Sequence, residues 1–561
     1  MSLDDILVRV GEFGKYQLGM FILLGVAIIP TAWHTITLVF IGGDQQQYWC
    51  RIQRLVNLSA ELTNQNTQSL RDIFVPMEID LSGKSKYSKC EYYDYDYDRM
   101  TVDDLMHWNR SSVRFQSNRT RRCEEWEFEN GNTILVQYSL FCEREWFVSM
   151  VRTMFFAGFF VGVIVSGSLS DRYGRFKCFM ISIVLEIVTG VISPFVGNYY
   201  VFVAFRFLIG ATSGAAYTTA FVIILEITGQ KYRMYAGVLA QWGFCFGVII
   251  APGVAWLIRD HIYFQLFIAL SAVPFLACYW LVPESPRWLI QKKRFVEAEV
   301  VIQKIAIVNG KHDGTTTYLS VLSGKKQEES HDVSSANFFD LLKTPNLRKT
   351  SLNIFASWFV ASLLYYGLLL SSKSLGDNVY VNTALTGVME IGAYVTCILL
   401  LNRVGRRWTM SGAFILAGTM LLCCIALLDT KNLTWLLIAI SSIGKLADSV
   451  AFTIVYLYSA ELFPTVVRNV GVGAGSMFAR FGGLVAPQVA RLNTVWAPLP
   501  TIIFGASAIA VGMLNTRLPE THGKQLPETL EDGENFGKSK RKPNESEIPL
   551  KEVVECTHTT V

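Results

Sequence analysis

Long apolar segments separated by short polar ones make up most of this chain. Each apolar segment has about 20 residues, the length at which a helix crosses the hydrocarbon core of a bilayer. The first lacks a small-residue cleavage site and is longer than the apolar core of a signal peptide, so we expect it to be retained. The pattern predicts twelve membrane-spanning helices, at 17–41, 147–169, 178–196, 200–225, 235–258, 262–282, 351–371, 380–401, 409–429, 433–459, 469–490 and 498–517.

Composition agrees with a membrane protein. Hydrophobic residues make up 51% of the chain and charged residues 17%, whereas soluble globular proteins carry about 25% charged residues. The formal net charge of +4 gives no general basic field for nucleic acid. The polar segments hold no phosphate-binding loop, metal-ligand cluster or nucleophile–base pair, so we expect no enzyme, cofactor or metal site. The expected fold class is an all-α protein in contact with the lipid bilayer.

Basic residues in short loops predict the orientation, because cytosolic loops are enriched in lysine and arginine. They gather after the second and eighth helices, at Arg172, Arg175, Lys177, Arg403, Arg406 and Arg407. The polar segment 283–350 is also rich in them. With twelve helices these segments share one side. We therefore expect the head 1–16, the central loop 283–350 and the disordered tail 518–561 to be cytosolic, and 42–146 to be extracellular.

The outer segment 42–146 carries its own signs of an oxidising compartment. Its four cysteines are Cys50, Cys90, Cys123 and Cys142. An even number in a polar extracellular stretch predicts two disulfides, although four cysteines allow three pairings. Three glycosylation sequons lie in the same segment, at Asn57, Asn109 and Asn118.

The chain also repeats itself. The loop Asp171-Arg-Tyr-Gly-Arg-Phe recurs 231 residues later as Asn402-Arg-Val-Gly-Arg-Arg. Glu226 stands seven residues before Arg233, and Glu461 stands in the same way seven residues before Arg468, 235 residues later. Pro283-Glu284 recurs 236 residues later as Pro519-Glu520. Such nearly constant offsets predict two six-helix halves. Parallel halves of this kind are a known design of secondary transporters, with the substrate bound between them.

Several motifs resemble those of a known family. Gly167-Ser-Leu-Ser-Asp-Arg-Tyr-Gly-Arg-Phe-Lys resembles the signature loop of the major facilitator superfamily, and Arg206-x-x-x-Gly resembles its fourth-helix motif. Pro283-Glu-Ser-Pro-Arg-Trp-Leu and Ala460-Glu-Leu-Phe-Pro-Thr-Val-Val-Arg-Asn-Val-Gly resemble motifs of the organic cation/anion/carnitine transporters, the solute carrier 22 family. The resemblance implies the major facilitator fold with a large outer loop between the first two helices. One departure is the number of cysteines in that loop, four where organic cation members carry six.

Charged residues near the expected cytosolic mouth suit a conformational latch. They are Asp171, Arg172, Arg175, Glu226, Arg233, Glu461 and Arg468. Exposed ion pairs contribute about 0–1 kcal/mol each, which suits contacts that form and break during alternating access. We expect Asp171 to bridge helix ends through the neighbouring arginines, and each glutamate to pair with the arginine seven residues later. The alternative is that these charges only set the topology.

Four ionisable residues fall within predicted membrane helices, where such groups are costly and usually functional. They are Glu390, Lys445, Asp448 and Arg480. The resemblance implies a substrate role for Arg480, because anion and carnitine carriers have arginine there and cation carriers aspartate. Glu390 resembles an acid that cation and carnitine carriers keep. Lys445 and Asp448, three residues apart, could instead neutralise each other, and Arg480 or Glu390 could form a structural ion pair.

Aromatic and polar residues of the same helices are candidates for an amine-binding box through cation–π contacts. They are Trp33, His34, Gln241, Trp242, Trp358, Tyr365 and Tyr366. The resemblance favours Tyr365. Packing is the alternative role for Trp358 and Tyr366, and a structural hydrogen bond is the alternative for His34.

The sequence therefore predicts a plasma-membrane secondary transporter of small organic cations or carnitine-like zwitterions, working by alternating access. An organic anion exchanger and a non-transporting receptor or sensor are the alternatives. A coupling ion, Na⁺ or H⁺, is left open. The end Thr559-Thr560-Val561 matches what PDZ domains bind, so a PDZ scaffold is a further expected partner.

Overall fold

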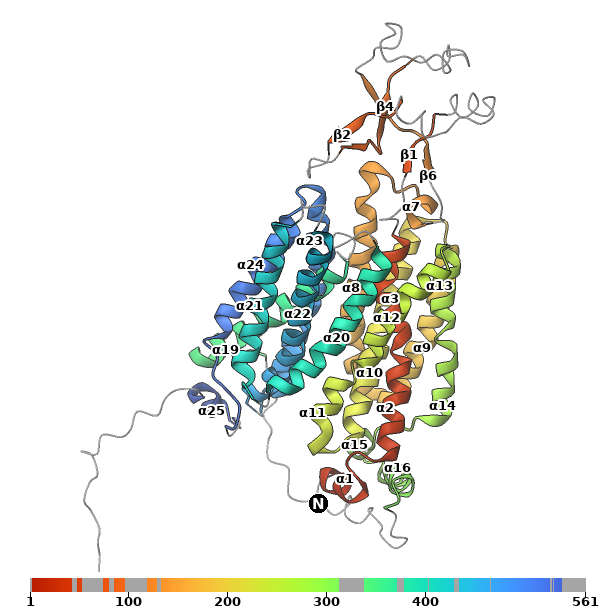
Figure 1. Ribbon diagram of the computed structural model, residues 1–561. Coiled ribbons are helices and arrows are strands. Elements are labelled where there is room, and N and C mark those ends of the chain that lie inside the picture. The colour runs from red at the N-terminus through yellow and green to blue at the C-terminus, as the bar shows by residue number, and fades with distance from the viewer. Residues whose placement is uncertain are drawn as a thin grey trace, which may run out of the picture.

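Helices dominate the computed structural model, which describes residues 3–42, 48–52, 74–79, 85–95, 119–128, 133–311, 338–370, 378–401, 403–427, 433–464, 466–524, 527 and 529–536. They form a long bundle with a group of short strands at one end and short helices at the other (Figure 1). Most of the chain thus has the all-α character that the apolar pattern predicts.

The first half of the bundle comprises the helices before the central segment: α2 (Lys15–Ala27), α3 (Ile29–Ile41), α8 (Trp146–Tyr173), α9 (Arg175–Ile192), α10 (Tyr199–Ile227), α11 (Gln230–Leu239), α12 (Trp242–Leu257), α13 (His261–Leu270) and α14 (Cys278–Leu281). The second half comprises α19 (Pro345–Leu370), α20 (Val379–Leu401), α21 (Arg406–Ile425), α22 (Thr434–Leu462), α23 (Arg468–Arg491) and α24 (Leu499–Asn515). Short helices outside the bundle are α1 (Leu3–Val10), α7 (Ile134–Gln137), α15 (Pro286–Gln291), α16 (Phe295–Val308), α18 (Asp340–Lys343) and α25 (Leu530–Asn535).

Ten helical stretches within the described ranges are long and apolar enough to cross a membrane. Each coincides with one of the twelve predicted segments. The two remaining segments are α23, which packs on α8 and α19, and α24, a shorter apolar helix that packs on α21. Both belong to the bundle, but the count of twelve spans stays a prediction.

Apolar side chains cover outer faces of the bundle. On α9, Ile181, Val184, Leu185 and Val188 are all at least 45% exposed and recur at helical spacing. A contiguous exposed apolar face is rare on a soluble monomer. Such a face is the surface that lipid tails require, so α9 supports the multi-pass membrane assignment.

Glycines bring helices of the first half into close contact. A methyl group at Gly162 of α8 would overlap the carbonyl oxygen of Ala211 on α10, and one at Gly210 of α10 would overlap the carbonyl oxygen of Phe155 on α8. Small residues let membrane helices approach backbone to backbone, which increases their van der Waals contact. The α8–α10 pair therefore depends on glycine from both sides.

The first predicted membrane segment, 17–41, is present but contains a break. The segment consists of α2 and α3, separated at Ile28. Pro30 is the second residue of α3 and has no N–H to continue the hydrogen-bond ladder of α2. The apolar pattern does not show this break, because both parts are equally apolar.

Two of the predicted polar segments also contain helices. The central loop 283–350 includes α15, α16 and α18, and α19 begins at Pro345 rather than at 351. In the tail, α25 begins after Thr529, whose hydroxyl accepts the N–H of Asp532 at 3.2 Å. The carboxylate of Glu534 then accepts the N–H of Asn346 at 2.8 Å and so caps the start of α19. The tail is therefore ordered at 530–535, contrary to our expectation.

The described residues of segment 42–146, which we predict to be extracellular, include three two-stranded antiparallel sheets. They pair β1 (Tyr48–Cys50) with β6 (Trp126–Phe128), β2 (Met77–Ile79) with β3 (Ser85–Tyr87), and β4 (Glu91–Tyr93) with β5 (Thr120–Arg122). Two disulfides hold this region, and they join Cys50 to Cys123 and Cys90 to Cys142. The expected two bridges are thus present, with one of the three possible pairings. The sequons at Asn57, Asn109 and Asn118 lie outside the described residues.

Candidate functional site

Three helices of the second half bring four side chains together inside the bundle. Tyr365 lies on α19, Glu390 on α20, and Lys445 and Asp448 on α22. The Tyr365 hydroxyl donates a 2.5 Å hydrogen bond to Glu390 Oε1, and Lys445 Nζ donates to the Tyr365 carbonyl at 3.2 Å. Lys445 Nζ also lies 3.4 Å from the centre of the Tyr365 ring and 3.8 Å from Asp448 Oδ2. We name these four residues the acid–tyrosine cluster.

The acid–tyrosine cluster contains two carboxylates, those of Glu390 and Asp448, and one ammonium, that of Lys445. Within the described structure, neither oxygen of Asp448 nor Oε2 of Glu390 accepts a hydrogen bond. Both side chains are at most 1% exposed. Buried polar atoms are normally hydrogen-bonded, and a buried polar atom without a hydrogen-bond partner costs a few kcal/mol. The cluster therefore has acceptor oxygens for a further positive group.

Arg480 lies on α23 at the boundary between the two halves. Its guanidinium carbon is 5.0 Å from the ring centre of Phe159 on α8, and its Nε has no hydrogen-bond partner among the described residues. Next to it, the rings of Phe481 and Phe160 lie 5.1 Å apart. A guanidinium in this place faces the other half of the bundle rather than lipid, so it can meet a ligand held between the halves.

The acid–tyrosine cluster also adjoins this boundary. Gly387 lies one turn before Glu390 on α20, and its carbonyl accepts the thiol of Cys245 on α12 at 3.0 Å. At the α8–α23 contact, Gln488 donates to the Thr153 hydroxyl at 2.8 Å. Thr153 lies in the part of α8 nearer the strands, whereas Cys245 and Arg480 lie near the middle of the stretches Gln230–Leu257 and Arg468–Arg491. These contacts therefore join the halves at the middle of the bundle and towards the strands.

The other predicted box residues pack in different places. The Trp33 indole donates to the Gly247 carbonyl at 2.9 Å, and Trp242 lies against Gly25, so both join α2–α3 to α12. The Tyr217 hydroxyl donates to Gln241 Oε1.

His34 faces Glu186 of α9 at 3.9 Å rather than the acid–tyrosine cluster. In the second half, Trp358 donates to the Ser459 hydroxyl at 2.9 Å, while the ring of Tyr366 lies 4.6 Å from that of Phe156. Of the predicted box, only Tyr365 contacts the charged residues of the cluster in the described structure.

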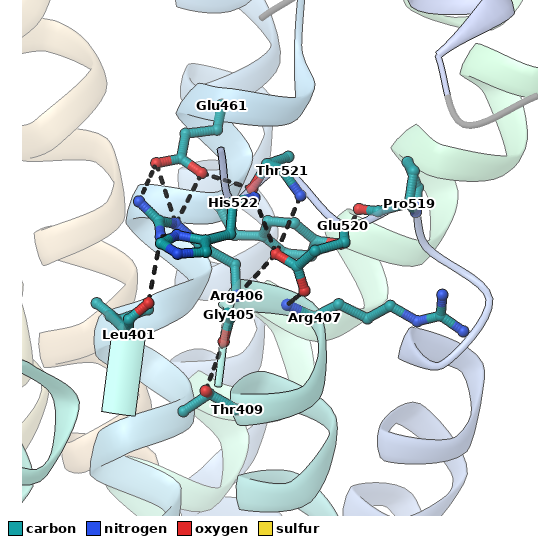
Figure 2. Close-up of polar contacts among 11 residues, drawn as sticks. Leu401, Gly405, Arg406, Arg407, Thr409, Glu461, Pro519, Glu520, Thr521 and His522 are labelled. Carbon is teal, nitrogen blue, oxygen red and sulfur yellow. Dashed lines mark hydrogen bonds and ion pairs between the residues drawn. The ribbon is translucent and has the colours of Figure 1, made fainter. Parts of the chain in front are cut away.

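Figure 2 shows a charged cluster at the end of the second half away from the strands. Arg406, at the start of α21, lies 3.1 Å from Glu461 of α22. The carboxylate of Glu520 accepts the N–H groups of Arg406 at 2.9 Å and Arg407 at 3.1 Å, so it caps α21. Burial alone raises the pKa of Glu520, but the N–H groups of His522, Arg406, Arg407 and Thr521 hold that pKa below its ordinary value. The carboxylate thus stays charged at the helix terminus, where the dipole favours an anion.

The first half repeats this arrangement. Arg175, at the start of α9, lies 3.4 Å from Glu226, and Glu284 accepts the Arg175 N–H at 2.8 Å. The residues before the two helices, Gly174 and Gly405, have φ of +117° and +91°, which only glycine adopts without strain. We did not predict from the sequence that Glu284 and Glu520 cap these helices, although the repeated Pro-Glu pairs indicated that both positions matter.

These contacts correct the expected pairing of each glutamate with the arginine seven residues later. Arg233 lies on α11, beyond the turn at 228–229, and bonds Asp4 of α1 at 2.8 Å. Arg468 donates from Nε to the Phe463 carbonyl at 3.3 Å. The turn after each glutamate points the later arginine away, so Glu226 and Glu461 pair with the signature-loop arginines instead.

The signature-loop residues themselves stay within the first half. Asp171 forms an ion pair with Arg175 one turn later, and the Arg172 guanidinium lies 5.3 Å from the ring centre of Tyr173. The latch role of all these residues stays a prediction.

Two related halves of membrane helices with charges buried at their boundary define a multi-pass membrane transporter. The chain matches the family model described as "Sugar (and other) transporter" over residues 104–532. It is 37% identical to "Organic cation transporter protein" of Drosophila melanogaster, over 96% of this chain and 95% of the relative. It is 34% identical to "Solute carrier family 22 member 3" of Mus musculus, over 96% of each. The chain belongs to the major facilitator superfamily and, within it, to solute carrier family 22, which are transporters and not enzymes.

A solved structure agrees on the fold. The inward-open conformation of the xylose transporter XylE from E. coli matches with a TM-score of 0.58 and 16% identity, over 92% of this chain and 99% of XylE. At that identity the likeness establishes the major facilitator fold and says nothing about the substrate.

Proposed function

We propose that this protein is a plasma-membrane secondary transporter of small organic cations or zwitterions. The observation that carries the proposal is the acid–tyrosine cluster, in which Lys445 lies near Asp448 and over the Tyr365 ring, while the buried Glu390 keeps one oxygen without a donor in the described structure. The names of the relatives, which include organic cation transporters of Drosophila melanogaster, support the same class of substrate.

The position of Lys445 indicates how a cation would bind. Its ammonium lies over the Tyr365 ring and near Asp448, so it makes the contacts that a substrate ammonium would make. Glu390, held by the Tyr365 hydroxyl, keeps one oxygen without a donor in the described structure. We propose that the substrate ammonium binds between Glu390 and the Tyr365 ring, while Lys445 stays with Asp448.

Arg480 supports a zwitterion over a simple cation. Its planar fork can bind a carboxylate through two charge-assisted hydrogen bonds. It lies at the boundary of the halves, as a group that holds the other end of a bound substrate would. The same arginine, together with Lys445, favours the second candidate, an organic anion exchanger.

The distribution of contacts supports alternating access. The described contacts between the halves lie at the middle of the bundle and towards the strands, as expected for a carrier closed towards the outside. The clusters around Arg175 and Arg406 hold each half together at the other end. We propose that this end is cytosolic, together with both termini, and that the signature loops pair across the halves when it closes. The end Thr559-Thr560-Val561 lies outside the described residues, and a PDZ scaffold at it remains a proposal.

Uptake of a small panel of labelled compounds tests this function. In cells expressing the protein we expect saturable uptake of tetraethylammonium, carnitine or both, because the acid–tyrosine cluster favours an ammonium. Untransfected cells give the background, and surface biotinylation gives the amount of carrier. Uptake restricted to an aromatic carboxylate would identify the anion exchanger instead, and saturable binding without flux of any compound would identify a receptor.

A further inference from the structure

A second buried charged group lies wholly inside the first half and plays no part in the proposed substrate site. It consists of His34 on α3, Glu186 on α9, and Arg206 and Ser213 on α10. Each of these side chains is at most 2% exposed. Ionisable groups at this depth are costly and usually functional.

The histidine and the glutamate are close without being bonded. The Ser213 hydroxyl donates to Glu186 Oε1 at 2.7 Å. His34 Nε2 lies 3.9 Å from the same oxygen, beyond hydrogen-bond distance, and has no hydrogen-bond partner among the described residues. A proton on this nitrogen would convert the contact into a charge-assisted hydrogen bond after a small approach of the two side chains.

Arg206 fixes the charge of the group. Its Nη2 donates to the His34 backbone carbonyl at 3.2 Å, and its guanidinium lies 5.2 Å from the Phe155 ring centre. Arginine keeps its charge in proteins. With Glu186 ionised and His34 neutral the charges cancel, so a single added proton is the charge that the group can gain and lose.

The helices packed around α3 bring no further charge to His34 in the described structure. On α8, Arg152 donates to the Leu38 carbonyl, one turn nearer the strands. On α12, the Cys245 thiol bonds the Gly387 carbonyl of the other half. On α13, His261 bonds Gln137 at 2.8 Å, at the strand end of the bundle. The charged side chains that face His34 are therefore Glu186 and Arg206.

The break in the first membrane helix lies beside this group. His34 is four residues after Pro30 and so within the first turns of α3. Secondary transporters often place ion sites at interrupted helices, where helix termini and unwound backbone are available to the ion. A shift of α3 relative to α9 would change the distance between His34 and Glu186 directly.

We propose that His34 and Glu186 form a proton-binding site, and that the carrier moves its substrate together with this proton. The proton bonds to His34 Nε2 and is shared with Glu186 Oε1 when α3 and α9 are close. It leaves to water on the other side when they separate, and no other bond forms or breaks. The coupling to substrate rests on the proposed transport function, whereas proton binding itself does not.

Uptake of tetraethylammonium at different external pH tests the coupling, because the charge of this probe does not change with pH. Wild-type uptake should change at least about fivefold between about pH 5.5 and about pH 8, the smallest usual effect of linked sites. His34→Gln and Glu186→Gln should lose this dependence, and with it the acidification that accompanies uptake. Exchange of labelled for unlabelled tetraethylammonium, which needs no net proton movement, should persist and show that the variants are folded. His261→Gln, a second buried histidine of the same half, is the matched control and should keep the wild-type pH profile.

Infrared difference spectra of the purified protein test proton binding without any substrate. Between the same two pH values, the wild type should show an imidazole ring band of His34 that His34→Gln lacks. Identical spectra, or identical pH profiles of uptake in the wild type and both variants, would overturn the proposal. If the band is present but tetraethylammonium is not carried, proton binding stands and the proposed function fails.

Discussion

Replacing Arg480 by lysine is expected to lower carnitine uptake by about tenfold to a hundredfold and to leave tetraethylammonium uptake nearly unchanged. Arginine presents two parallel donors to a carboxylate, and lysine presents a point charge. Hydrogen bonds to charged groups contribute about 1.5–3 kcal/mol, which corresponds to this range. The measurement is initial uptake of the two labelled compounds, divided by surface abundance.

Arg491→Lys is the control for this prediction, because Arg491 ends the same helix and lies far along it from Arg480. Carnitine uptake at the wild-type level in Arg480→Lys would show that Arg480 does not bind a carboxylate. An equal loss for both compounds would show instead that Arg480 is structural.

The second large effect is expected for Gly162→Ala, on stability. The added methyl group would meet the backbone carbonyl of Ala211 on α10, which cannot rotate away as a side chain can. Overpacking of this kind costs about 1–3 kcal/mol. We expect a lower thermal midpoint for the protein in detergent and less protein at the cell surface.

Gly167→Ala is the matched control in the same helix, because a methyl group there meets no atom within 4 Å. Alanine is favoured over glycine in a helix interior by about 0.5–1 kcal/mol, so this variant should be at least as stable as the wild type. If the two variants melt together, close α8–α10 packing does not govern stability.

The membrane helices were predictable because the bilayer sets their length. The segment predicted at 200–225 is α10, Tyr199–Ile227, and the segment predicted at 380–401 is α20, Val379–Leu401. An apolar segment ends where the helix leaves the hydrocarbon core of the bilayer, so the ends of each helix can be located in the sequence. The break at Ile28 and helix α25 were missed because hydrophobicity does not encode them. Both depend on single residues such as Pro30 and on distant partners.

The sequence predicted which residues belong to the candidate site better than it predicted the contacts between them. Lys445 and Asp448 are three residues apart on one helix, so their ion pair follows from helical geometry. The bond from Tyr365 to Glu390 joins two helices, and no spacing along the chain predicts it. The contact of His34 with Glu186 was likewise not predictable, because Glu186 is 152 positions away and lies near His34 only in the folded bundle.

The most direct test of the central claim is tetraethylammonium uptake into proteoliposomes by the wild type, Glu390→Gln and Asp448→Asn. Glutamine keeps the shape of the side chain and its acceptor for the Tyr365 hydroxyl, so Glu390→Gln should fold. In Glu390→Gln the substrate ammonium loses its charged partner, and removing one partner of a buried charge pair costs at least about 2 kcal/mol. We therefore predict that tetraethylammonium uptake by Glu390→Gln falls at least about thirtyfold. Asp448→Asn should keep most of the uptake. Normal uptake by Glu390→Gln together with loss in Asp448→Asn would contradict the account, as would a wild type that carries only carboxylates.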